Sequence, residues 1–193
     1  STGKPDVIQD IDAVVLAVGA KGIQSLMSQS PECREAAPEL VAAGSLGTID
    51  VVSIRLWLDR YVPIPYPANV FSRFEALQGA GGTFFMLDQL QNSAEQDLWG
   101  GHDPQGSVVA SDFYNASTIA LMNDQDIIDL LTKELLPIAD QRFKAVTVVD
   151  YEVRRYPNSV SLFSPGSFLQ RPPLETSVSS IVCAGDWVRM GDK

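Results

Sequence analysis

The sequence predicts an α+β protein, in which an antiparallel sheet with helices is flanked by a strand of the parallel type near each end of the chain. Three observations support this fold class. Residues 12–18 and 180–184 are short and apolar throughout, which is typical of strands buried on both faces of a parallel sheet. Residues 51–59 alternate apolar and polar side chains, as half-buried antiparallel strands do. Residues 123–140 carry the apolar stripe of an amphipathic helix.

The first parallel-type strand is followed by glycine and then by a predicted helix. Gly19 ends the strand, and residues 31–43 predict a short helix. Ser30 is a suitable cap for its first turn, and Gly44 follows its last. Pro38 lies inside this helix and is expected to interrupt it.

The middle of the chain predicts an antiparallel sheet. In residues 51–59 one face is apolar and consists of Val52, Ile54, Leu56 and Leu58. Three prolines make residues 61–69 a loop or a sheet edge, because proline cannot donate to a strand ladder. Residues 70–74 and 83–87 predict two strands on either side of a glycine turn. Residues 92–105 predict a loop, and residues 107–113 predict a further strand.

The last third begins with the main helix, which Asn123 can cap and Pro137 is expected to end or kink. Residues 145–154 predict a strand, and residues 156–173 predict a crossing segment rich in proline and serine. The two parallel-type strands need neighbours that the middle of the chain does not supply. The order therefore predicts a second domain inserted into a nucleotide-binding domain.

Composition excludes some classes of function. The chain has 193 residues, of which 45% are hydrophobic, so it can bury a substantial core. Its net charge of −10 argues against a nucleic-acid partner, because 24 acidic residues outnumber 14 basic ones. No apolar run approaches the roughly 20 residues that span a bilayer. The two cysteines, Cys33 and Cys183, lie far apart in the sequence and form no C-x-x-C pair, so they suggest neither a zinc site nor a disulfide framework. They are consistent with ordinary buried thiols in a reducing compartment.

No catalytic side chain can be named from the sequence. His102 is the one histidine and has no cysteine or glutamate at ligand spacing, so neither a hydrolytic triad nor a metal site is predicted. The glycines at 79–82 lack the spacing of a phosphate loop and predict a hairpin turn. Trp57, Phe71 and Phe85 are candidates for lining an apolar substrate pocket, with core packing as the alternative.

The most informative segment is Ala184-Gly185-Asp186-Trp187, which follows the last predicted strand directly. Glycine lets a backbone approach a phosphate or a ribityl chain, and a carboxylate accepts hydrogen bonds from sugar-like hydroxyls. This grouping therefore indicates a nucleotide-type cofactor.

The order of several segments resembles that of the flavin-dependent amine oxidase and carotenoid (phytoene) desaturase superfamily. The likeness is carried in sequence by the strand 12–18, the Trp57-Leu-Asp-Arg60 run, Asp126-Ile-Ile-Asp129, Ser164-Pro-Gly-Ser167 with Arg171-Pro172, and the Ala184–Trp187 segment. It covers nearly the whole chain and is more specific for the superfamily than for any substrate. The N-terminal G-x-G-x-x-G of that superfamily is absent from this sequence.

The resemblance implies the cofactor FAD, bound by Ala17, Val18, Gly19, Ala184, Gly185, Asp186 and Trp187. It also implies three segments: a returning part of a Rossmann-like FAD-binding domain at 1–28, a substrate-binding domain at 29–175, and the start of a closing FAD-contact motif at 176–193. The overall class of the full-length protein would then be α/β. The implied reaction is removal of hydride from a C–C or C–N bond of an apolar or lipidic substrate, with the flavin supplying the chemistry.

The same resemblance implies that the chain is an internal to C-terminal fragment that alone neither holds FAD nor turns over. Two alternatives remain at this stage: a noncatalytic binding or structural subunit built on the same substrate domain, and an unrelated soluble α+β binding domain. The superfamily further implies a plastid or cyanobacterial-type compartment, or otherwise an intracellular one. It leaves membrane association and membership of a larger assembly as open expectations.

Overall fold

The computed structural model describes residues 7–72, 74–90 and 97–191. The chain divides into two compact units, one formed by residues 1–48 together with 159–193 and the other by residues 49–158. Each unit has its own hydrophobic core. These units divide the chain at 48/49 and 158/159, whereas the predicted domain boundaries are 28/29 and 175/176.

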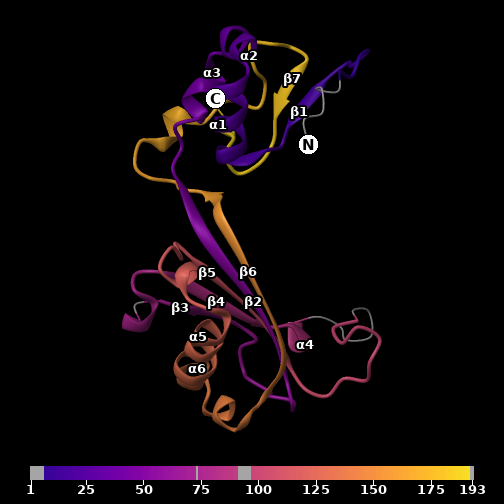
Figure 1. Cartoon of the computed structure of the whole chain (residues 1–193), viewed down its shortest axis with the longest axis vertical. Helices are drawn as coiled ribbons and strands as arrows, with labels where there is room; N and C mark the ends of the chain where they lie inside the picture. The colour runs from indigo at the N-terminus through magenta and orange to yellow at the C-terminus, as the bar shows by residue number, and fades with distance from the viewer. Residues whose placement is uncertain (1–6, 73, 91–96, 192–193) are drawn as a thin grey trace. The chain divides into compact units, whose positions relative to one another are not determined.

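The first unit contains a parallel pair of strands, as the sequence predicts. β1 (Val14–Leu16) pairs with β7 (Ile181–Cys183), so that Val14 lies opposite Ile181 and Leu16 opposite Cys183. Figure 1 shows the two strands side by side. The expectation of burial on both faces is wrong for β1, since Val15 is 61% exposed. Within the described residues this sheet has only two strands, so the outward-facing side chains of β1 have too few neighbours to bury them.

Three helices accompany this pair: α1 (Gly19–Gln29), α2 (Pro31–Ala36) and α3 (Glu39–Ala43). The break between α2 and α3 falls at Pro38, which confirms the expected interruption. The sequence analysis does not predict α1. Its buried residues, Ala20, Ile23 and Met27, recur with helical spacing and pack in the core of the unit.

In the second unit, five strands of the described chain form a sheet in the order β3-β4-β5-β2-β6. Their bounds are β2 (Thr48–Leu58), β3 (Ala68–Phe71), β4 (Gly81–Met86), β5 (Val108–Tyr114) and β6 (Val148–Ser161). The pairs β2–β5, β4–β5 and β3–β4 are antiparallel. The antiparallel sheet that the sequence predicts is therefore present.

β6 is longer than expected and includes part of the predicted crossing segment. It continues through Pro157 to Ser161. Proline removes a ladder donor, but β6 lies at the edge of the sheet, where a strand needs neighbours on one side only. Residues 156–161 are consequently strand, which corrects the sequence prediction.

The helical run of the second unit begins with α5 (Asp124–Asp129), passes through the π-helix η3 (Leu130–Leu135) and ends with α6 (Leu136–Ala139). Asn123 caps it, as expected, by accepting a hydrogen bond from the Asp126 amide at 2.9 Å. Pro137 lacks an N–H, and its ring would crowd the carbonyl of Lys133 in a regular α-helix. The wider π-turn just before it, in which the Leu136 amide bonds to Leu131, avoids this crowding.

Shorter elements connect these segments. They are α4 (Leu87–Leu90) and the 3₁₀ turns η1 (Glu75–Leu77), η2 (Ile119–Leu121), η4 (Gln141–Ala145) and η5 (Ser167–Gln170). The loop predicted at 92–105 falls partly outside the described residues, and residues 97–105 contain turns without regular structure.

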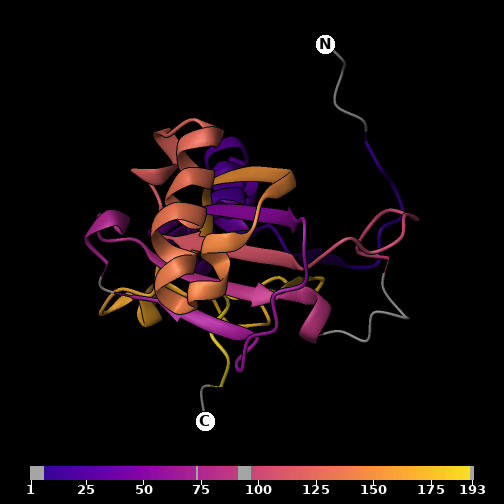
Figure 2. The same cartoon turned by 90° about the horizontal axis from the view of Figure 1, so that it is seen from below.

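The sheet of the second unit has one covered face and one open face. Val52, Ile54 and Leu56 are at most 2% exposed and pack with Leu131 and Leu135 of the helical run. Figure 2 shows this run, in salmon and orange, lying over the magenta strands. We call the opposite side the open face. Its side chains are Ser53, Arg55, Trp57, Thr83, Phe85, Ala110 and Asp112, which the strand register places together.

Candidate functional site

The predicted cofactor residues meet where β1 and β7 end. Parallel strands finish at the same edge of a sheet, so the segments after Leu16 and after Cys183 begin side by side. The Ala184 amide donates to the Leu16 carbonyl at 3.0 Å, which joins the two segments directly. We call this place the carboxyl-edge site and define it by Ala17, Val18, Gly19, Ala184, Gly185 and Asp186.

Both glycines of the carboxyl-edge site adopt backbone angles that side chains disfavour. Gly19 has φ +65° at the start of α1, and a Cβ there would meet no atom within 4 Å. Gly185 has φ +124°, and a Cβ there would lie 2.9 Å from Cδ1 of Trp187. The first glycine leaves space beside the helix start, and the second allows the chain to turn closely around Trp187.

The N-terminus of α1 also faces this edge. Its N-cap residue, Val18, makes no side-chain capping hydrogen bond, so the amides of the first turn have no capping side chain as acceptor. The helix has 11 residues, and its positive end favours an anionic group. Gly22 allows the first turn of α1 to lie close to the Val18 side chain, since a Cβ at position 22 would lie 2.7 Å from Cβ of Val18.

Arg171 holds the second loop in place. One of its terminal nitrogens donates to the carbonyl of Asp186 at 2.8 Å and also to the carbonyl of Val188. Its guanidinium carbon lies 4.8 Å from the ring centre of Phe163. The backbone of Asp186 is thereby fixed while its carboxylate stays exposed to solvent. The sequence identifies Arg171 as part of the family resemblance but predicts no role for it.

Trp187 does not line the site. Its side chain is fully buried in the core of the first unit, and its indole N–H donates to the Ala184 carbonyl at 2.9 Å. The structure thus corrects its inclusion among the cofactor-contacting residues. Trp187 packs against the loop at Gly185 from the core side and has no solvent-exposed atoms.

The segment before β7 is fixed by a carboxylate of α3. Glu39 accepts hydrogen bonds from the Ser177 amide and, at 2.9 Å, from the Ser177 hydroxyl. Burial acts to raise the pKa of Glu39, but these hydrogen bonds outweigh it and leave the pKa below its ordinary value of 4.5. The pKa of Cys183 is raised by burial and by the nearby Glu39 carboxylate, so Cys183 is a buried, protonated thiol, whereas Cys33 is only partly buried.

The three aromatic residues predicted to share a pocket do not share a surface. Trp57 and Phe85 lie on the open face, whereas Phe71 lies on the covered face and is 2% exposed. The Phe71 ring stacks on that of Phe84, with 5.1 Å between the ring centres. Phe71 is therefore a core residue, which was the alternative interpretation. On the open face, the Trp57 indole donates to the Leu98 carbonyl at 2.6 Å.

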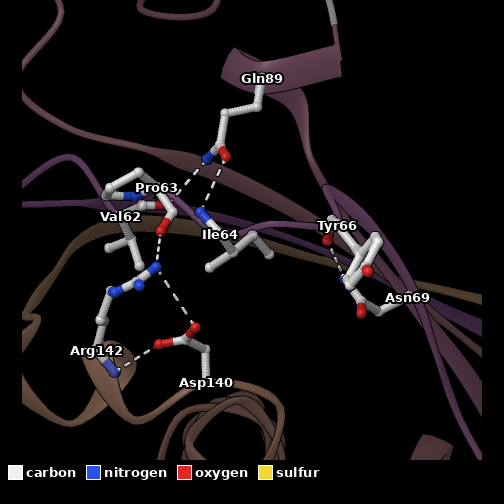
Figure 3. A network of polar contacts seen from close by, with 8 residues as sticks. All are labelled: Val62, Pro63, Ile64, Tyr66, Asn69, Gln89, Asp140 and Arg142. Atoms are coloured by element: carbon white, nitrogen blue, oxygen red, sulfur yellow. Dashed lines mark hydrogen bonds and ion pairs between the residues drawn. The ribbon is translucent and has the colours of Figure 1, made fainter.

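The proline-rich loop beyond β2 is held by two side chains, which Figure 3 shows. The Gln89 amide donates to the Val62 carbonyl at 2.9 Å and accepts from the Ile64 amide at 3.1 Å. Arg142 donates to the carbonyl of Pro63 from the other side. The loop therefore has a defined backbone, although its three prolines remove it from the sheet ladder.

The described residues contain no cluster of three or more His, Cys, Asp and Glu side chains placed to hold a metal ion. In the same part of the chain, no helix has the length and apolar character needed to cross a bilayer. His102 is exposed and lies beside a small hollow of about 190 Å³ that Trp99 and Asp88 also line.

Comparisons with known proteins relate the chain to others through its fold. No family model and no curated protein matches the sequence. Among solved structures, it resembles a protein from Exiguobacterium sp. 255-15 described as a "Putative protoporphyrinogen oxidase", with a TM-score of 0.52 and 13% identity over 92% of this chain. An oxidoreductase from Methanosarcina mazei aligns over 95% of this chain with a TM-score of 0.47 and 16% identity. The chain spans 36% and 39% of these two proteins, respectively.

Proposed function

We propose that the chain is part of a FAD-dependent oxidoreductase, in which the carboxyl-edge site holds the cofactor and the open face of the sheet serves the substrate. The observation that carries this proposal is the meeting of two distant segments, Ala17–Gly19 and Ala184–Asp186, at one edge of a parallel strand pair. Ligands of α/β sheets bind at that edge. The fold likeness to the Exiguobacterium protein supports an oxidoreductase.

The side chains and backbone at this edge fit a dinucleotide. The uncapped N-terminus of α1 suits a pyrophosphate, and Gly19 leaves space beside it. The exposed carboxylate of Asp186 can accept hydrogen bonds from ribityl or ribose hydroxyls. When bound, FAD would supply the acceptance of hydride from a C–C or C–N bond. The residues of this chain bind and orient the cofactor, and the open face orients the substrate.

The proposal is tested on the full-length protein that carries this chain. We expect the purified protein to be yellow, with flavin absorption bands, and to retain FAD through gel filtration. Asp186→Ala should lower the affinity for FAD by about tenfold, because two or so hydroxyl hydrogen bonds to a carboxylate are lost. Fluorescence titration of FAD measures this change.

Asp12→Ala is the matched control, since Asp12 is an exposed carboxylate near the start of β1 and outside the carboxyl-edge site. It should bind FAD as the unaltered protein does. A colourless protein that takes up no added FAD would refute the proposed function. Equal FAD affinity in the Asp186→Ala variant would show that Asp186 does not contact the cofactor.

A further inference from the structure

The outer edge of β6 is an unpaired edge of the sheet. β6 stands at the end of the strand order, and among the described residues no strand pairs on its far side. The strand has 14 residues, and most side chains of residues 149–159 are exposed to solvent. Such an edge presents amide and carbonyl groups that can continue a ladder with another chain.

The hydrogen bonds at the end of β2 show which of its residues bond to β6. The Leu58 amide donates to the Ser107 carbonyl, directly before β5, at 2.9 Å. The Asp59 amide donates to the Thr147 carbonyl, directly before β6, also at 2.9 Å. Backbone groups alternate between the two sides of a strand. The even-numbered residues of β2 therefore bond toward β5 and the odd-numbered residues toward β6.

The faces of the side chains then identify the outward backbone groups of β6. Glu152, Arg154 and Tyr156 line one hollow of the open face together with the odd-numbered Ser53 and Arg55 of β2. Residues directly opposite each other in a ladder share a face, so the even-numbered residues of β6 bond to β2. The outward row consists of the backbone groups of Tyr151, Val153 and Arg155.

Two features of the strand agree with this assignment. The Tyr151 amide donates to the carboxylate of the preceding residue, Asp150, at 2.8 Å, as an amide outside the ladder can. Pro157 falls in the same outward row, where its missing N–H costs the sheet no hydrogen bond. The edge therefore offers one short run of outward amides, which Pro157 ends.

The charges beside this run are complementary to those of a second copy in one register. Suppose that two copies pair antiparallel with Val153 opposite Val153. Glu152 of each copy then lies opposite Arg154 of the other. A shift by two residues, the smallest that keeps the outward groups facing each other, places either Glu152 or Arg154 opposite its own copy, where like charges repel.

Glu152 and Arg154 are also accessible to such a partner. Within one chain they form an ion pair at 2.5 Å, and their side chains remain 44% and 62% exposed, respectively. An exposed pair of this kind can share its charges with a second, inverted pair without burying an unmatched charge.

We propose that β6 is a dimer interface, at which two copies of this protein join their sheets edge to edge. The backbone groups of Tyr151, Val153 and Arg155 extend the ladder across the dyad, and Glu152 and Arg154 of the two copies form a charge quartet that fixes the register. The short contact makes a weak dimer, with a dissociation constant on the order of 10–100 µM. This inference is independent of the proposed cofactor, since it uses no residue of the carboxyl-edge site.

Sedimentation of the full-length protein that carries this chain, over a range of concentrations, tests the proposal. We expect a monomer–dimer equilibrium that shifts toward the monomer as salt is added, because the charge quartet is open to solvent. Hydrogen exchange at the amides of Val153 and Arg155 should slow as the protein concentration rises. These are outward amides, which gain acceptors only in the dimer.

Charge reversal tests the register. Glu152→Arg and Arg154→Glu should each weaken the dimer about tenfold, because each replaces two attractive contacts by two repulsive ones. An equimolar mixture of the two variants should dimerise again, since every cation of one variant then faces a carboxylate of the other. Arg34→Glu, which makes the same change of charge at an exposed position of α2, is the matched control and should dimerise as the unaltered protein does.

Circular dichroism of each variant establishes that the sheet is intact. Three results would overturn the inference: a protein that stays monomeric up to about 1 mM, a dimer that neither reversal weakens, or a mixture of the two variants that does not dimerise. None of them bears on FAD, because sedimentation reports on mass and needs no flavin. A protein that dimerises in this way yet fails to bind FAD would refute the cofactor assignment alone.

Discussion

At the scale of single residues, Arg171 supports one of the two loops of the carboxyl-edge site. It contacts neither Gly185 nor the Asp186 carboxylate in the hydrogen bonds described above, but it holds the carbonyls on both sides of Trp187. Such hydrogen bonds from a charged donor contribute more than neutral ones do. The conformation of this loop therefore depends on a side chain that enters from a different segment.

Arg171→Ala should loosen the loop without unfolding the first unit. The Val188 amide, which bonds to the Gly185 carbonyl at 3.2 Å, reports on this loop directly. We expect its hydrogen exchange to become roughly tenfold faster, corresponding to a loss of about 1.4 kcal/mol in local stability. Arg34→Ala, at an exposed position of α2, should leave that exchange unchanged. Equal rates in the two variants would mean that Arg171 does not hold the loop.

At the scale of elements, the cap of α5 contributes measurably to the second unit. Asn123 accepts the Asp126 amide and so satisfies one of the free donors at the helix start. Asn123→Ala should lower the free energy of unfolding by about 1 kcal/mol, as measured by urea denaturation. Gln125→Ala in the same turn serves as control and should change it by less than about 0.5 kcal/mol. A cap variant as stable as this control would contradict the assignment.

The contact between α3 and the segment before β7 should depend on pH. Because the pKa of Glu39 is lowered in the folded chain, its contribution to stability is present above the ordinary value of 4.5 and is lost as the pH falls through the lower, folded value. Glu39→Gln should therefore be less stable than the unaltered chain at neutral pH. The difference should shrink below about pH 4.5.

Urea unfolding at several pH values measures this difference, with Glu32→Gln in the exposed first turn of α2 as control. The control should show a small difference that does not vary with pH. A stability gap for Glu39→Gln that grows on acidification would reverse the expected sign and exclude the Ser177 hydrogen bonds as its cause.

The elements that the sequence predicts well are those whose pattern is local. The alternation in β2 and the cap of α5 follow directly from neighbouring residues, and both are present. The sequence does not predict α1, because it contains two glycines, which often end regular structure: the φ of +65° favours glycine at position 19, and close packing against Val18 requires it at position 22. The end of β6 was missed because Pro157 is tolerated only at a sheet edge, and the edge is a property of the whole sheet.

The same distinction applies to the candidate site. Its glycines and Asp186 are visible in sequence because the residue types suit a nucleotide. The burial of Trp187, the separation of Phe71 from Trp57 and the role of Arg171 each depend on which side of a strand or loop a residue occupies. A one-residue change of register would exchange the two faces of the sheet, so composition alone does not assign them.

At the scale of the whole molecule, the two units have separate cores, and each core should respond to its own substitutions. Leu131 and Ile23 are both fully buried, the first in the core of the second unit and the second in that of the first. Leu131→Ala should cost the second unit about 3 kcal/mol. Amide protection should then fall throughout residues 49–158 and far less in the helices α1 to α3.

Ile23→Ala is the reciprocal variant, and its loss of amide protection should be concentrated in residues 7–48 and 159–191. Hydrogen exchange followed residue by residue distinguishes the two patterns. If either variant lowers protection equally in both units, the chain unfolds as one cooperative body and the division does not hold energetically.

The pairing of β1 with β7 sets an order of events during synthesis. β1 is translated before its partner β7, and all of the second unit is translated between them. Among the described residues, the strands of the second unit pair with one another and not with β1 or β7, so that unit can complete its sheet while β1 still lacks a partner. The carboxyl-edge site would then assemble after the second unit, through a loop closure whose entropic cost grows only slowly with the length of the intervening chain.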